Sequence, residues 1–217
     1  MKKLLILTLV ASATLFSCSK SSITKPSTPS TTAAITDTVV IGNQTWTSIN
    51  YNGAGGVNYN NSSTNDPTYG KLYTLAEAQA IVLPTGWHLP STDDYNTLMK
   101  NLGATNQDSN GYYLPLQSTT LQLMSTSKWA LQEGGNNSGF NAYPAGYYNT
   151  QESSGFSGQT AEADFITTSI LAGYPGVQAN FLIYEAQQSN TLLIGSVFSD
   201  ALGFASDRGS IRFVKNN

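Results

Sequence analysis

The single histidine of the chain, His88, is the residue with the most evident capacity for chemistry. It lies in the segment GWHLPSTDDYNTL, between Trp87 and Pro90. A Ser-His-Asp or Cys-His device would use this imidazole as its base, but the chain has no G-x-S-x-G nucleophile motif. A zinc site needs three or four His, Cys or carboxylate ligands, and the chain cannot supply the usual set. We therefore expect His88 to be structural and hydrogen-bonded near the start of the helix that follows it.

Carboxylates are the second group that could do chemistry. A glycosidase needs two carboxyl groups on opposite sides of the scissile bond. Any set of five carboxylates offers a pair, so this pattern predicts no catalytic residue, and we expect a protein that is not an enzyme. The candidates, scattered through the second half of the chain, are Glu133, Glu152, Glu162, Asp164 and Glu185.

Two loops rich in oxygen ligands raise the question of calcium. They are TNDPTYG, residues 64–70, and DSNG, residues 108–111. Asp and Asn in loops more often form turns through their own backbone. We expect no metal and no cofactor, and a structural calcium ion is an alternative that no motif supports.

Aromatic side chains in the Gly/Asn-rich loops are the candidate ligand contacts. Trp129, Tyr148 and Tyr174 lie in these loops. Exposed aromatic rings flanked by Asn and Gln can stack on sugars or anchor protein partners. We therefore predict that these three residues lie at the surface and bind a ligand.

The N-terminal residues predict export. A basic MKK start, an apolar stretch too short for a membrane helix and the sequence CSK together form a secretory signal layout. Leu15–Cys18 resembles a bacterial lipobox, whose cysteine becomes diacylated, although Phe16 departs from the usual small residue. We expect a lipoprotein signal peptide over residues 1–17 and lipidation at Cys18, the only cysteine. The expected location is a bacterial cell envelope, at the outer membrane, facing the periplasm or the exterior.

The rest of the chain divides into a stalk and one domain. Residues 18–36 are rich in Ser, Thr and Pro and predict a flexible stalk. Residues 37–217 are long enough for one domain with a substantial core. The chain has 10 basic and 13 acidic residues and no basic stripe, which argues against a nucleic-acid partner.

The elements that must position the candidate residues indicate an α+β fold. We expect a first hairpin, then two helices, then long loops, then late strands, because the sequence shows no alternating βαβ pattern. Ser91 is the expected N-cap of the second helix, with Asp93 and Asp94 in its first turn. The expected ranges are 37–51 for the hairpin, 74–81 and 92–102 for the helices, and 163–169, 179–188 and 210–215 for the strands, the last of them in a final hairpin with a turn near DRG.

Five segments occur in the order seen in the Fibrobacter succinogenes major paralogous domain family. The chain resembles that family over essentially the whole domain. The segments are VVIGNQTW (39–46), YGKLYTLAEA (69–78), PTGWHLPSTDDYNTL (84–98), NNSGFNAYPAGYY (136–148) and SIRFVKN (210–216).

The same family resembles the C-type lectin-like fold, and this implies the architecture. It implies two helices, a small antiparallel sheet, paired N- and C-terminal strands, and long irregular loops that form a ligand face. Leu83 and Phe213 stand where the family usually has cysteines, so the resemblance implies that these two side chains touch in the core. It implies no defined activity, and the calcium-dependent sugar motifs of C-type lectins do not occur. Formylglycine generation, the main enzymatic precedent for such a fold, depends on cysteines that this domain lacks.

The expected function is therefore binding. We expect an exported, lipid-anchored binding module that recognises a glycan or protein ligand through its loop face, for instance in adhesion. A polysaccharide or cell-wall hydrolase is one alternative, and a structural envelope component without a small ligand is another. The membrane is expected as a partner through the lipid anchor alone.

Overall fold

The computed structural model describes residues 31–114, 116–153 and 155–217, and every structural statement below concerns these residues. They belong to one compact unit, which begins at Thr31. The predicted signal peptide, the lipidation site Cys18 and most of the predicted stalk lie outside the described residues. The last stalk residues contact the domain, since Ala33 N donates to Val82 O at 2.8 Å and Ile35 packs against a core cluster.

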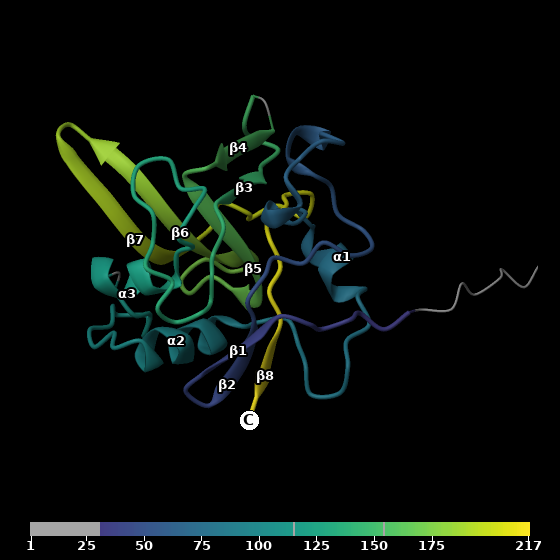
Figure 1. Ribbon diagram of the computed structural model, residues 1–217, viewed down its shortest axis with the longest axis horizontal. Coiled ribbons are helices and arrows are strands. Elements are labelled where there is room, and N and C mark those ends of the chain that lie inside the picture. Colours follow the sequence, from purple (N-terminus) through teal and green to yellow (C-terminus); the bar gives the residue numbers. More distant parts are fainter. Residues whose placement is uncertain (1–30, 115, 154) are drawn as a thin grey trace, which may run out of the picture. The chain divides into compact units, whose positions relative to one another are not determined.

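The described chain is an α+β fold with two sheets (Figure 1). Its α-helices are α1 Leu75–Gln79, α2 Thr92–Asn101 and α3 Gln117–Leu123. The first sheet has the order β1-β2-β8, with β1 Thr38–Ile41, β2 Gln44–Thr47 and β8 Val214–Asn216. The second has the order β4-β3-β5-β6-β7, with β3 Ala145–Tyr148, β4 Phe156–Gln159, β5 Glu162–Ile170, β6 Gln178–Gln188 and β7 Thr191–Ser199.

The first sheet joins the two ends of the domain. Strands β1 and β2 form the hairpin predicted from the sequence, and Gly42 turns between them with a positive φ of 60°. Trp46 of β2 pairs in turn with Val214 of β8. The pairing of N- and C-terminal strands that the family resemblance implies is therefore present.

Helix α2 follows the predicted design closely. Ser91 Oγ accepts a hydrogen bond from Asp94 N, and Asp94 Oδ2 accepts one from Ser91 N at 2.8 Å, so the two residues form a capping box. Tyr95, Leu98 and Met99 are buried on one face of the helix. The spacing of three and four residues was therefore a reliable guide to the buried face.

The second sheet is larger than the sequence indicates. The strands predicted near 163–169 and 179–188 are present as β5 and β6, but β3, β4 and β7 were not predicted, and neither was α3. One pair, β3 with β5, is parallel, so the sheet is not purely antiparallel as expected. The sequence predicted two helices and one small antiparallel sheet, whereas the described residues form three α-helices and two sheets, so both predicted numbers were wrong.

The predicted final hairpin is absent from the described residues. The segment before β8 instead forms single bridges to three separate parts of the chain, so its backbone groups find partners far away in sequence rather than across a local turn. These bridges are Arg208 with Tyr148, Gly209 with Tyr73, and Ser210 with Phe165.

Two main clusters fill the core on opposite faces of the second sheet. The face that carries Phe165 and Phe181 packs against α2 and α3, and Trp46 packs there on Tyr95 with ring centroids 5.0 Å apart. The opposite face carries Ile166 and packs against α1.

The Trp-His-Leu-Pro block contributes to the second of these clusters. Leu89 and Trp87 pack there with Phe213. Leu83, partly buried, packs against the same cluster, in keeping with the contact between Leu83 and Phe213 that the resemblance implies. Within the described residues, no helix has the length and apolar character needed to span a bilayer.

Candidate ligand-binding site

His88 occupies a structural position. Its backbone pairs with Val214, with His88 N donating to Val214 O at 2.9 Å and Val214 N donating back at 3.0 Å. Its Nε2 lies 3.3 Å from Asp94 Oδ2, the same oxygen that completes the capping box of α2. His88 is thus hydrogen-bonded at the start of the helix, as predicted, and ties the helix cap to β8.

The five candidate carboxylates differ in their surroundings. None of the hollows described here is lined by two of them. Glu185 is buried and accepts hydrogen bonds from Leu131 N at 2.7 Å and Gln132 N at 2.8 Å, so it holds a loop in place. Asp164 is wholly buried beside Asn180, and Glu133 is exposed. Burial and the nearby Glu152 raise the pKa of Glu162.

A buried arginine, Arg212, holds backbone segments together inside the domain, and the sequence did not predict this role. Arg212 is fully buried and donates through its guanidinium to three backbone carbonyl oxygens and to Asn50 Oδ1. Its carbonyl partners are Thr47 O at 2.7 Å, Phe140 O at 2.7 Å and Asn141 O at 2.8 Å. Burial lowers the pKa of Arg212 to about 9, so the group remains charged at neutral pH. An arginine inside the apolar pattern SIRFV was the only sequence signal for it.

The three predicted aromatic contacts do not converge. Trp129 is only 5% exposed, and its Nε1 donates to Ala142 O at 3.1 Å. Its predicted surface position is therefore wrong, because the loop folds back and satisfies the indole N–H inside the core. Tyr148 is half-buried and packs edge-on against Phe156, while Tyr174 is 57% exposed.

Tyr174 lies at the rim of an open hollow of about 270 Å³, which we call the Tyr174 hollow. Three segments far apart in sequence form it: the loop after α2, the turn between β5 and β6, and the end of β7. Its lining residues are Asp108, Asn110, Tyr112, Leu171, Ala172, Tyr174, Phe198, Ser199 and Asp200.

The wall of the Tyr174 hollow is held by hydrogen bonds and by ring packing. Asp108 Oδ1 accepts hydrogen bonds from Asn110 N at 2.8 Å and from Tyr112 N at 2.9 Å. The side chain of Asp108 thereby closes the turn of the DSNG loop. Tyr112 Oη in turn accepts from Ala172 N at 3.1 Å, and its ring packs on Phe198 with centroids 4.4 Å apart. Tyr112 thereby joins all three segments.

The Tyr174 ring is presented at the tip of a closed turn. Tyr174 N donates to Leu171 O at 3.0 Å, and Val177 N donates to Tyr174 O at 3.1 Å. Gly173 and Gly176 flank the ring, both with a φ of 82°, a conformation that L side chains rarely adopt. These backbone bonds therefore hold the turn that presents the exposed ring.

The lining of the Tyr174 hollow suits a ligand with many hydroxyl groups. Asp108 and Asp200 supply carboxylates, Asn110 supplies an amide, and the Tyr174 ring supplies an apolar face. No Lys, Arg or His lines this hollow, so it offers no counter-charge to an anionic ligand. Among the described residues, no group of three or more His, Cys, Asp or Glu side chains is placed to hold a metal ion.

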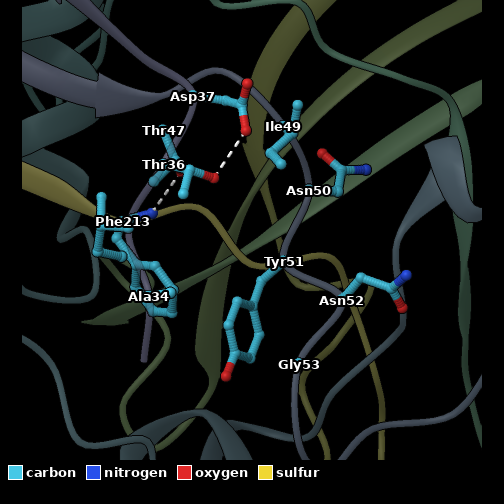
Figure 2. Close-up of a pocket in the computed structure, with 11 residues that line it drawn as sticks. Ala34, Thr36, Asp37, Thr47, Ile49, Asn50, Tyr51, Asn52, Gly53 and Phe213 are labelled. Atoms are coloured by element: carbon cyan, nitrogen blue, oxygen red, sulfur yellow. Dashed lines mark hydrogen bonds between the residues drawn. The ribbon is translucent and has the colours of Figure 1, made fainter. Parts of the chain in front are cut away.

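A second hollow of about 250 Å³ lies where the chain enters the domain, and Figure 2 shows its lining. Residues 34–37 form one side and residues 49–53 the other, and Thr47 and Phe213 complete the lining. Thr36 Oγ1 donates to Asp37 Oδ2 at 2.7 Å, and Phe213 N donates to Thr47 Oγ1 at 3.0 Å (Figure 2). Asp37 is the only charged side chain in the lining, so this hollow offers less chemistry than the Tyr174 hollow.

The comparisons with known proteins identify a family and no closer relative. The model of the Fibrobacter succinogenes major domain matches residues 39–215, which span both sheets and all the helices described above. No curated protein and no solved structure matches the chain. The chain therefore belongs to the Fibrobacter succinogenes major domain family.

Proposed function

We propose that this protein is an exported binding module that recognises a glycan through the Tyr174 hollow. The observation that carries the proposal is the combination, in one open hollow, of an exposed aromatic ring on a hydrogen-bonded turn with carboxylate, amide and hydroxyl groups. Aromatic rings stack on the apolar faces of sugar rings, and oxygen acceptors bind their hydroxyl groups. The lining carries no cation, so the expected ligand is an uncharged glycan.

The proposal includes a C-type lectin-like architecture. The pairing of the first hairpin with β8 supports it, as does a ligand hollow built by loops at the end of a sheet. The irregular stretch between α2 and β3, which comprises the described residues of 102–144 apart from α3, is the kind of loop region that such a fold uses for binding. Because one fold can host many functions, the ligand has to be identified by experiments on the hollow itself.

The proposal also includes a lipid anchor at Cys18 and an envelope location. The signal layout and the lipobox-like LFSC segment support both. Metabolic labelling with a radioactive fatty acid tests the anchor: the wild-type chain becomes labelled, and Cys18→Ala does not. Labelling of both chains, or of neither, contradicts the anchor without touching the binding proposal.

A glycan array tests the binding function. Residues 31–217 are screened with calcium and with a chelator, since oxygen-rich loops such as DSNG can hold calcium. Selective binding that survives chelation is expected. If the protein binds a protein fraction and no glycan, the glycan proposal is wrong and the ligand is a protein.

A hydrolase remains the second candidate because of one observation. Burial and Glu152 raise the pKa of Glu162, and a carboxyl group with a raised pKa can serve as a general acid. Tyr147 Oη lies 3.5 Å from Glu152 Oε1 in the same neighbourhood. Release of reducing ends from bound polysaccharide, lost in Glu162→Gln, would favour this candidate over simple binding.

A further inference from the structure

One wall of the Tyr174 hollow is apolar. Leu171, Ala172 and Phe198 line the hollow, and all three are partly accessible to solvent. The ring of Tyr112 packs on Phe198, and its Oη accepts a hydrogen bond from Ala172 N, so these residues adjoin one another. We call these four residues the apolar wall. A sugar hydroxyl group gains nothing from such a surface, whereas a methyl group that covers it is removed from water.

The hollow also offers hydrogen-bond donors that have no acceptor among the described residues. Asn110 is exposed and is bonded there only through its backbone N–H, which leaves its side-chain amide available. Tyr112 Oη accepts from Ala172 N, but its own hydrogen has no acceptor in the described part of the chain. A phenol hydroxyl donates as well as accepts, so both side chains can donate to a carbonyl oxygen of a ligand.

Asp200 supplies an acceptor in the same hollow. Its side chain is exposed and makes no hydrogen bond to any described residue, since only its backbone oxygen accepts, from Gly203 N at 2.9 Å. Asp108 is less available, because its Oδ1 already accepts two backbone N–H groups. An ionised carboxylate accepts and cannot donate, so Asp200 favours a ligand group that carries an N–H or O–H.

An acetamido group matches these three kinds of partner at once. Its methyl group can cover the apolar wall, its carbonyl oxygen can accept from Asn110 or Tyr112, and its N–H can donate to Asp200. A hydroxyl group in the same place would leave the apolar wall uncovered. A free amine would pair with Asp200 but would leave both the apolar wall and the donors without a partner.

We propose, on the basis of the glycan-binding function proposed above, that the Tyr174 hollow selects an N-acetylhexosamine, with its acetamido group against the apolar wall and its ring against Tyr174. The hollow measures about 270 Å³, slightly below the roughly 300–1,000 Å³ of pockets that bury a drug-sized ligand, so it holds one sugar residue of a chain. The described lining contains no Lys, Arg or His, so an acidic amino sugar has no counter-charge there.

NMR titration of residues 31–217 with matched sugars tests the selection. N-acetylglucosamine is compared with glucose, and N-acetylgalactosamine with galactose, because the members of each pair differ only in the acetamido group. In at least one pair the N-acetylated sugar should bind about tenfold more tightly. One buried methyl group contributes about fourfold, and an added hydrogen bond accounts for the rest.

The outcomes separate this selection from the proposed function. Equal affinities within both pairs, or tighter binding of glucosamine than of N-acetylglucosamine, overturn the selection. If the protein binds other glycans on the array but none of these sugars, the selection is wrong and the glycan function stands. If it binds no glycan at all, both are wrong.

Substitutions identify the groups that make the selection. The ratio of the two dissociation constants within the pair that binds is measured, because partial unfolding weakens the binding of both sugars equally. Leu171→Ser and Asn110→Ala should each lower this ratio several-fold, since the first reduces the apolar wall and the second removes a donor. Leu193→Ser and Asn137→Ala, at exposed positions outside the hollow, are the matched controls and should keep the wild-type ratio. A wild-type ratio in Asn110→Ala, whose exposed position makes misfolding an insufficient explanation, contradicts the proposed contacts.

Discussion

Asp164 Oδ1 accepts a 2.7 Å hydrogen bond from Asn180 Nδ2, while the other oxygens of both side chains, Asp164 Oδ2 and Asn180 Oδ1, are buried without a partner. Burial is the main cause that raises the pKa of Asp164 well above its ordinary value, and the nearby Glu162 adds to it. A neutral Asp164 can donate from its second oxygen to Asn180. We therefore interpret the two residues as a cross-strand pair of a carboxylic acid and an amide.

Asp164→Asn should stabilise the protein at neutral pH by about 1–3 kcal/mol, because an amide supplies the same donor as the neutral acid without the free-energy cost of binding a proton on folding. Below the pKa of an unfolded Asp, about 3.9, Asp164 is protonated in both the folded and the unfolded chain, and its full contribution to the free energy of unfolding is present. As the pH rises from there through the higher folded pKa, the unfolded chain releases its proton first, and the free energy of unfolding falls.

The measurement is the unfolding midpoint of both chains from acid to neutral pH. The wild-type midpoint should decline across this window, and the Asp164→Asn midpoint should decline less. Glu133→Gln, at an exposed carboxylate, is the control and should keep the wild-type slope. Parallel profiles for wild type and Asp164→Asn would mean that Asp164 is ionised in the folded protein.

Arg212→Met should destabilise the fold by roughly 3 kcal/mol or more, because it leaves buried carbonyl groups of Thr47, Phe140 and Asn141 without donors. Arg208→Met is the matched control. Arg208 makes a partly exposed 2.6 Å ion pair with Glu77, so its loss should cost less than about 1 kcal/mol. Denaturant unfolding measures both, and equal costs would contradict the role assigned to the hydrogen bonds of Arg212.

His88→Gln should change the free energy of unfolding by less than about 1 kcal/mol, since its side chain is 41% exposed and makes one long contact with Asp94. Ser91→Ala, which removes the cap of α2, should cost about 1 kcal/mol. Thermal unfolding and glycan binding are measured on both chains. Loss of binding in His88→Gln at wild-type stability would show that His88 has a functional role.

Leu83→Cys combined with Phe213→Cys should form an intramolecular disulfide on oxidation, because both side chains belong to one core cluster. The oxidised chain should exceed the reduced chain of the same variant by about 2–4 kcal/mol in unfolding free energy. Thiol titration and thermal unfolding of the two redox states check this. Free thiols after oxidation would refute the contact that the family resemblance implies.

The sequence was most informative where short-range chemistry decides the structure. The cap at Ser91 and the apolar spacing in α2 are local, and both were predicted correctly. So was the β1–β2 hairpin, whose turn needs a residue such as Gly42. The family resemblance supplied the long-range pairing of β2 with β8, which no local pattern contains.

The sequence was least informative where distant partners decide. Trp129 lies in a loop that reads as exposed, yet Ala142 O supplies its buried acceptor. Glu185 and Arg212 look like surface charges, but loop backbone groups hold them inside the fold. Tyr174 was correctly placed at the surface, whereas the hollow beside it depends on Tyr112 and Phe198, which only the folded chain brings together.

The most direct test of the account is the affinity of the Tyr174 hollow for a glycan. The strongest array ligand is titrated calorimetrically into wild type, Tyr174→Ala and Val40→Ala, the last a comparably exposed apolar position on β1. Loss of a stacking ring should weaken binding by about tenfold or more, equivalent to about 1.4 kcal/mol, whereas the control should bind as wild type does. Equal affinity in all three chains, or no glycan binding by the wild type, would contradict a glycan site at the Tyr174 hollow.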